Sequence, residues 1–211
     1  EKLIEYGKTD IRIQYNTNFS ELRYKDKHVF DYWQHFKNVS VGASLDASGA
    51  RAELMRKGTD WRQTVRNREL MIEQVPHVDF YVSSTVSSMN VLHVLDFHKE
   101  WTELGLIKAK DWSVNICQSP DWYRADIFPD WFKAGFIKPA YENHIEWLEP
   151  QDQLGRATQG YKALNTFINQ DEESPEALAE FFKMNDAVDK IRNERFEDVF
   201  PEYKELRNYA V

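Results

Sequence analysis

The sequence predicts an α/β fold built on a parallel sheet, and two observations favour this class. Predicted strands alternate with segments of helical periodicity three times, as in consecutive βα units. Each predicted strand also ends in small polar residues, which are typical of the ligand-facing edge of a parallel sheet. The stretch 39–49 is the clearest case, since a short apolar strand runs into Ser44-Leu45-Asp46 and turns at Gly49 into a charged helical segment.

The composition suits one domain, or one domain with a tail. The chain has 211 residues, of which 42% are hydrophobic and 29% charged, enough for a sizeable core. A net charge of −8 without a basic stripe argues against nucleic acid as a partner. No apolar run reaches the roughly 18 residues of a membrane span. Cys117 is the single cysteine, which excludes an internal disulfide and favours a cytoplasmic protein.

Elements of the first half follow from their periodicities. Residues 9–15 and 78–86 alternate apolar and polar side chains, whereas 39–43 is a run of small and β-branched residues. The segment 26–36 has apolar residues at helical spacing, and the helix that follows residue 59 ends before Pro76. The predicted strands are therefore 9–15, 39–43 and 78–86, and the predicted helices are 1–7, 26–36 and 59–75.

The second half continues with one more βα unit and then changes character. A helix over 91–104 stops at Gly105, and a fourth strand is predicted at 112–117. From about Phe128 the pattern is mainly helical, with Ser174 as the cap of one helix. We therefore expect an α/β region over 1–129 and a helical extension over 130–211 that packs on the sheet or on a partner. Its predicted helices are 141–148, 151–167 and 175–200.

Several polar residues have both a structural and a functional interpretation. Asn16-Thr17-Asn18 follows a strand, where turn chemistry is favoured over ligand binding. His93 and Asp96 can share a helix face as metal ligands, while His98 points elsewhere; surface or capping roles are favoured for all three.

Arg56 and Cys117 also leave alternatives open. Arg56 can fold back over the end of the central strand to meet a ligand carboxylate, but a surface pair with Glu53 on the same helix is favoured. Cys117 can be a nucleophile, but a small buried apolar role is favoured.

The region from Tyr15 to Asn90 resembles the second half of the radical S-adenosylmethionine superfamily. The resemblance rests on Asn16-Thr17-Asn18 after a strand, on Ser44-Leu45-Asp46 followed by Glu53 and Arg56, on the run Arg56–Trp61, and on the strand end Thr85–Asn90. The chain as a whole is similar to twitch-domain members of that superfamily, with Pro120–Pro129 resembling their post-barrel region.

The resemblance implies a fold, a cofactor and a set of site residues. The fold would be the C-terminal part of a partial (β/α)6 barrel, its fourth to sixth strands, followed by the helical extension. Thr17, Asn18, Ser44 and Asp46 would contact the ribose and methionine parts of S-adenosylmethionine. Arg56 would meet the carboxylate of the cofactor, and Asn90 would line the substrate or adenosine side.

The resemblance also implies an activity. The complete enzyme would use a [4Fe–4S] cluster and an electron donor to cleave S-adenosylmethionine to a 5′-deoxyadenosyl radical. That radical would abstract hydrogen from an unknown small-molecule or peptide substrate.

One departure from the family pattern changes what is expected of this chain. The family holds its cluster with three cysteines spaced CxxxCxxC, and also carries a Gly-Gly-Glu-Pro segment, neither of which is present here. We therefore expect a fragment of a longer enzyme that is inactive alone, with no metal ligands of its own and with an exposed sheet edge prone to association. The alternative is a non-catalytic binding or scaffold protein derived from the same fold.

Overall fold

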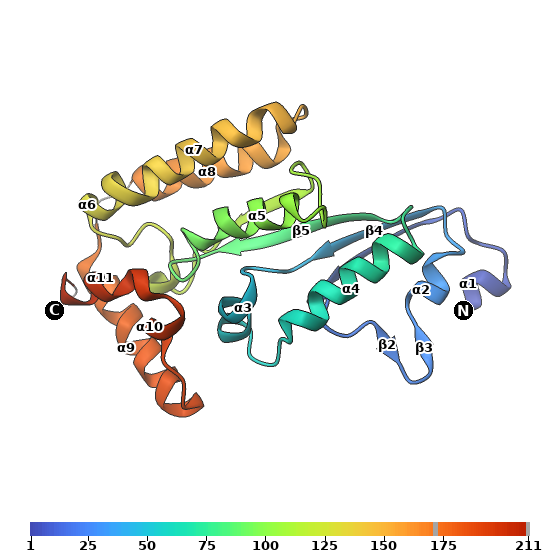
Figure 1. The fold of residues 1–211 in the computed structure, drawn as a ribbon, viewed down its shortest axis with the longest axis horizontal. Coiled ribbons are helices and arrows are strands. Elements are labelled where there is room, and N and C mark those ends of the chain that lie inside the picture. The colour runs from blue at the N-terminus through green and yellow to red at the C-terminus, as the bar shows by residue number, and fades with distance from the viewer. Residues whose placement is uncertain (171–172, 210–211) are drawn as a thin grey trace.

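The computed structural model describes residues 1–170 and 173–209, and its centre is a four-stranded parallel sheet (Figure 1). The strand order is β1-β4-β5-β6, and all three neighbouring pairs are parallel. This confirms the predicted α/β class with a parallel sheet. The strands are β1 (Arg12–Thr17), β4 (Asn38–Ala43), β5 (Asp79–Val86) and β6 (Trp112–Ile116).

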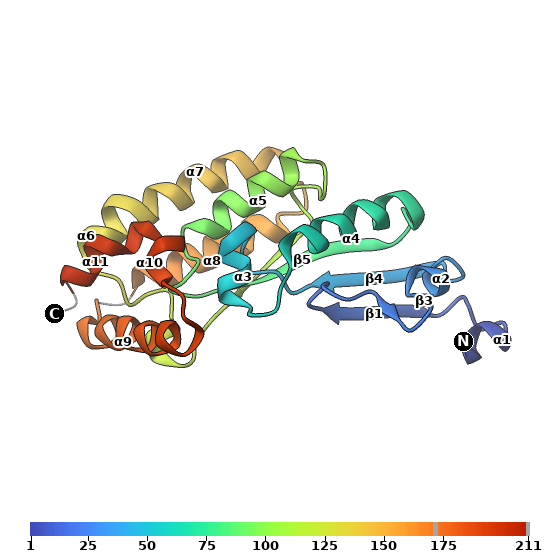
Figure 2. The ribbon, with the colours of Figure 1, turned by 60° about the horizontal axis from the view of Figure 1, so that its bottom comes forward.

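Helices connect consecutive strands as βα units require. α3 (Gly49–Met55) and α4 (Trp61–Gln74) join β4 to β5, and α5 (His93–Glu103) joins β5 to β6. α4 begins where Asp60 accepts a hydrogen bond from the Gln63 amide, 3.0 Å away, which satisfies a free donor of the first turn. Figure 2 shows α4, α5 and α7 on the same side of the strands.

The helix predicted over 26–36 is wrong in its first half. The structure has a short hairpin there, β2 (Arg23–Tyr24) with β3 (Lys27–His28), and only a one-turn helix α2 (Phe30–Trp33). Lys25 adopts a φ of 57°, which turns the hairpin, and Asp31 accepts from the His28 amide just before α2. The helical spacing of apolar residues is real, but these local turns interrupt it. The predicted helix 1–7 survives as α1 (Lys2–Glu5).

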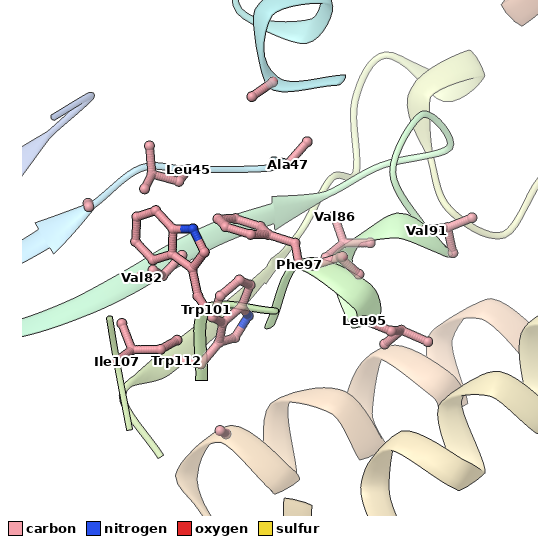
Figure 3. Close-up of a cluster of buried hydrophobic side chains, with 14 of the residues drawn as sticks. Leu45, Ala47, Val82, Val86, Val91, Leu95, Phe97, Trp101, Ile107 and Trp112 are labelled. Carbon is pink, nitrogen blue, oxygen red and sulfur yellow. The ribbon is translucent and has the colours of Figure 1, made fainter. Parts of the chain in front are cut away.

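One face of the sheet, here called the helix face, is apolar and buried. Paired residues such as Val41 with Phe80 and Val82 with Trp112 place their side chains on this face. The edge-to-face rings of Phe97 and Trp101 from α5 pack here, with Phe97 also 5.0 Å from Trp112 between ring centroids. Figure 3 shows this cluster gathered between β5 and α5.

The other face, here called the open face, is polar along its whole length. Register places Asn16 beside Gly42, Gly42 beside Tyr81, and Thr85 beside Asn115. Parallel sheets are usually covered by apolar contacts on both faces, so this polarity is unusual. The open face consists of Arg12, Gln14 and Asn16 of β1, Asn38, Ser40 and Gly42 of β4, Asp79, Tyr81, Ser83 and Thr85 of β5, and Ser113 and Asn115 of β6.

The C-terminal extension is helical, as the sequence predicts. The helix predicted over 175–200 breaks at Asn193, which adopts a left-handed φ of 53°. No helix among the described residues is both long enough and apolar enough to cross a membrane. The helices are α6 (Asp130–Phe132), α7 (Lys138–Leu148), α8 (Arg156–Gln170), α9 (Pro175–Arg192), α10 (Phe196–Val199) and α11 (Lys204–Tyr209). Short 3-10 or π turns lie at Asp121–Tyr123, Lys133–Ile137, Glu149–Gln151 and Pro201–Tyr203.

The extension packs on the sheet and shares its core. α8 lies against β6, and a Cβ at Gly160 would be 3.3 Å from the Val114 Cβ, so the small residue permits the close approach. The Tyr141 hydroxyl donates to the Val91 carbonyl at 2.8 Å, which ties α7 to the loop before α5. The helices α9 to α11 lie beyond the carboxyl ends of the strands (Figure 1).

His98 is buried, whereas the sequence favours a surface or capping role. Its Nε2 lies 2.8 Å from the Ala109 carbonyl and its Nδ1 lies 3.1 Å from both His144 Nε2 and the Tyr161 hydroxyl. Burial lowers the pKa of His98 from 6.5 to about 4, and burial with the neighbouring His98 lowers that of His144 to about 3. Both imidazoles are therefore neutral in the folded protein at pH 7.

This buried pair predicts an acid-sensitive fold. The unfolded chain binds protons on both imidazoles below pH 6.5, while the folded chain resists protonation until about pH 4. The free energy of unfolding therefore falls as the pH drops through that window, by about 3 kcal/mol for His98. Urea unfolding at a series of pH values measures this pH dependence of the free energy of unfolding. Replacing His98 and His144 with Gln should reduce the slope between pH 6.5 and 4, and His93, whose pKa is also lowered to about 4, should account for part of the slope that remains. An unchanged slope would contradict the assignment.

Trp101 lies in the buried cluster of Figure 3, and its burial predicts a large contribution to stability. Trp101 is fully buried, so Trp101→Ala should lower the free energy of unfolding by about 3–5 kcal/mol. Leu104, on the same helix turn but 62% exposed, is the control, and Leu104→Ala should cost less than about 0.5 kcal/mol. Equal losses in denaturant titrations would show that α5 packs differently.

Candidate functional site

The candidate site lies at the carboxyl ends of β4 and β5, where the sequence predicts ligand-facing residues. Its centre is an ion pair between Asp46, in the loop after β4, and Arg56, at the end of α3. Arg56 Nε and Nη2 each lie 2.7 Å from Asp46 Oδ2. The favoured sequence expectation, a surface pair between Arg56 and Glu53, is therefore wrong. Glu53 instead accepts a hydrogen bond from the Trp61 amide at 3.0 Å.

Asp46 also links its own loop to the neighbouring strand. Its second oxygen, Oδ1, accepts from the Thr85 amide at 2.8 Å, and the side chain is 11% exposed. The Arg56 side chain is 39% exposed, and its Nη1 has no partner among the described residues. Both oxygens of the Asp46 carboxylate are thus hydrogen-bonded within the protein, whereas part of the Arg56 guanidinium faces solvent.

Asn90 is buried and joins three backbone segments. Its Nδ2 donates to the Asp46 carbonyl at 2.6 Å and to the Thr85 carbonyl at 3.1 Å. Its Oδ1 accepts from the Ser87 amide at 2.8 Å. The side chain is fully buried, so in this structure Asn90 holds the two strand ends together and does not present its amide to a ligand.

Thr17, Asn18 and Ser44 lie together at the ends of β1 and β4. The Ser44 amide donates to the Thr17 carbonyl at 2.7 Å, which extends the β1–β4 pairing by one residue. Thr17 Oγ1 accepts from the Phe19 amide and Asn18 Oδ1 from the Ser20 amide, the turn chemistry that the sequence favours for this segment. The Ser44 hydroxyl and the Asn18 amide nitrogen have no partner among the described residues.

The structure therefore separates the six predicted residues into two groups. The side chains of Asp46 and Asn90 form hydrogen bonds mainly within the protein, and these bonds fix the loop after β4 and the end of β5. The remaining four retain hydrogen-bonding capacity toward solvent. This second group consists of Thr17, Asn18, Ser44 and Arg56.

A further polar cluster braces the same loop and is not predicted by the sequence. The Ser48 hydroxyl donates to Glu100 at 2.7 Å, and the Ser48 amide donates to His93 Nε2 at 3.1 Å. Burial, and then the charge of Arg51, lowers the pKa of His93 to about 4. His93 is thus a neutral acceptor that holds the loop to α5. The metal-ligand hypothesis for His93 and Asp96 has no third ligand near it among the described residues.

The C-terminal helices also reach this end of the sheet. Arg51 of α3 pairs with both carboxylate oxygens of Glu202, at 2.7 and 3.1 Å. The Tyr203 hydroxyl donates to the Ser88 carbonyl in the loop after β5. No sequence signal predicts these contacts, because they join residues more than 110 positions apart.

Cys117 is half-buried, and its Sγ lies 3.5 Å from the Ser119 carbonyl, so the predicted buried apolar role is wrong.

A cavity of about 620 Å³ lies beside the edge strand β1, lined among others by Tyr15, Thr17 and Trp33. Because Tyr15 and Thr17 are on the helix face by register, this cavity is separate from the open face.

Comparison with protein-family models, with curated proteins and with solved structures found no match for the chain.

The role of Asn90 gives a testable prediction. Asn90→Ala would leave two carbonyls and an amide without their buried partner, so it should lower the free energy of unfolding by about 2–3 kcal/mol. Asn18→Ala, the same substitution at an exposed position, should change it by less than about 0.5 kcal/mol. Guanidinium titrations of the two variants measure the difference, and similar values would mean that Asn90 does not fix the strand ends.

Proposed function

We propose that this chain supplies the cofactor- and substrate-facing half of a radical S-adenosylmethionine enzyme. The observation that carries the proposal is the Arg56 guanidinium, fixed by Asp46 at the end of β4 with one nitrogen left free. A guanidinium held in this way suits a ligand carboxylate, because its orientation is set before the ligand binds. In parallel α/β sheets, ligands bind at this edge.

The remaining free groups fit the rest of the cofactor. S-adenosylmethionine combines a carboxylate, an ammonium group and a ribose with two hydroxyls. The carboxylate would meet Arg56, and the Ser44 hydroxyl and the Asn18 side chain would hydrogen-bond the ammonium or ribose groups. Thr17 is on the helix face by register and lines the separate cavity beside β1. When bound, the cofactor supplies the radical chemistry, and these residues supply its position.

The iron–sulfur cluster does not fit this chain. A [4Fe–4S] cluster of this type needs three cysteine thiolates, and Cys117 is the single cysteine of the sequence. No group of three candidate metal ligands occurs among the described residues. The cluster, its electron donor and the remaining strands of a partial (β/α)6 barrel would therefore come from polypeptide outside these 211 residues.

The alternative is a binding or scaffold protein, and one surface favours it. Trp131, Phe136 and Tyr209 are each at least 40% exposed, and the Trp131 ring centroid lies 6.2 Å from that of each of the other two rings. Exposed aromatic side chains in contact are typical of protein interfaces.

Binding of S-adenosylmethionine tests the proposal. Isothermal titration of the chain should detect binding, and Arg56→Ala should weaken it at least tenfold, since it removes a hydrogen bond between charged groups. Arg62→Ala, at an exposed position of α4, is the control and should bind like the parent. Thermal melts check that each variant is folded, and Arg56→Lys tests the need for a planar guanidinium. Equal affinity of the Arg56→Ala variant would favour the scaffold alternative.

Activity of the complete protein provides the second test. After anaerobic reconstitution with iron and sulfide, and with a reductant, it should form 5′-deoxyadenosine. No 5′-deoxyadenosine from protein that carries a full cluster would refute the proposed function.

A further inference from the structure

The middle of the open face contains a tyrosine that lies over a glycine. A Cβ at Gly42 would be 2.7 Å from the Tyr81 hydroxyl and 3.0 Å from Asn16 Oδ1. A side chain at position 42 would require Tyr81 to move, so Gly42 allows Tyr81 of β5 to reach across β4 toward Asn16 of β1. Side chains of β1 and β5 thereby meet over the backbone of β4.

Most polar groups around this point are free to bind a ligand. The Tyr81 hydroxyl forms no hydrogen bond to any described residue, and its ring contacts no other aromatic ring. The side chains of Gln14, Asn16 and Ser113 likewise have no partner in the described part of the chain. By contrast, Ser40 donates to Asp79, and Asn115 donates to Ser83, so the face has bonded pairs beside its free groups.

The charge of the open face restricts the ligand. Its charged residues, Arg12 and Asp79, lie at the amino ends of the strands, at the far end from the candidate site. Between them and the strand ends, the face has only hydroxyl, amide and phenol groups. A phosphate or carboxylate would find no cation here, and an amine would find no free anion. Hydroxyl and amide groups both donate and accept, which suits a neutral ligand that does the same.

The extent of the face also restricts the ligand. From Asp79 to Thr85 the side chains of β5 on this face span about 20 Å, at roughly 3.3 Å per residue. The four strands add a width of about 14 Å, at about 4.8 Å per neighbouring pair. A surface of this size holds a molecule of several linked units.

We propose that the open face binds the substrate, and that this substrate is a neutral polyhydroxylated molecule such as an oligosaccharide. The inference rests on the proposed function, because the face leads directly to the strand ends where the cofactor would lie. Tyr81 provides an apolar ring face for a sugar ring and a hydroxyl for its polar edge. Asn16, Gln14 and Ser113 hydrogen-bond the hydroxyl groups around it.

An extended peptide fits this surface less well. Peptide backbones pair with the edge of a sheet, where amide and carbonyl groups are free, and not with side chains on its face. A peptide lying across the face would leave most of its backbone groups partly unpaired. The oligosaccharide presents hydroxyls in all directions and meets the side-chain groups directly.

Ligand binding by the 211-residue chain tests the proposal. Maltohexaose, cellohexaose and chitohexaose are compared with a neutral Gly-Ser hexapeptide by saturation-transfer NMR. At least one oligosaccharide should bind, and Tyr81→Phe and Asn16→Ala should each weaken it about fivefold, the effect of one lost hydrogen bond. Tyr6→Phe is the control, since Tyr6 directly follows α1 and is 75% exposed, and it should leave binding unchanged.

Titration of the same samples with S-adenosylmethionine distinguishes the two proposals. Cofactor binding without any oligosaccharide binding would overturn the substrate class and leave the proposed function intact. Oligosaccharide binding without cofactor binding would refute the proposed function while keeping the ligand class of the face. Binding of the hexapeptide in place of the sugars would also overturn the inference. Sugar binding that neither Tyr81→Phe nor Asn16→Ala weakens would overturn it as well.

Discussion

Successive side chains of the four parallel strands point to opposite faces of the sheet, and this alternation decides where the helices pack. Because Val41, Phe80 and Val82 point to one side, the helices α4 and α5 pack on that side, and α7 and α8 of the extension add to the same layer. The opposite side then needs no apolar cover, and it remains a surface of hydroxyl and amide groups. A one-residue slip of any strand would exchange the two faces and bury its polar residues.

The strand ends depend on a second, smaller set of contacts. Asp46 accepts a hydrogen bond from the Thr85 amide of β5, and Asn90 donates one to the Asp46 carbonyl, which fixes the ends of β4 and β5 relative to each other. This arrangement leaves Ser44 and Arg56 in set positions with free groups. Side chains that are held before a ligand arrives lose less conformational entropy on binding.

Much of this architecture follows from the sequence, and the exceptions have physical causes. The strands and the helices α4 and α5 are predictable because their apolar periodicity is strong. The hairpin at 23–28 is missed because a single left-handed residue, Lys25, interrupts a helical pattern. The pairing of Arg56 with Asp46 depends on how α3 turns back over the strand, which spacing does not determine. The buried contacts of His98 and Asn90 require tertiary neighbours, and the open face requires strand register.

We infer that the strand ends and the open face form one ligand-binding surface. A crystal structure of the protein with bound S-adenosylhomocysteine would test this inference. The ligand carboxylate should lie within about 3 Å of the Arg56 guanidinium, with the Asp46 pair retained and the open face turned toward the ligand cavity. A ligand bound away from Arg56, or an open face covered by another part of the protein, would contradict it.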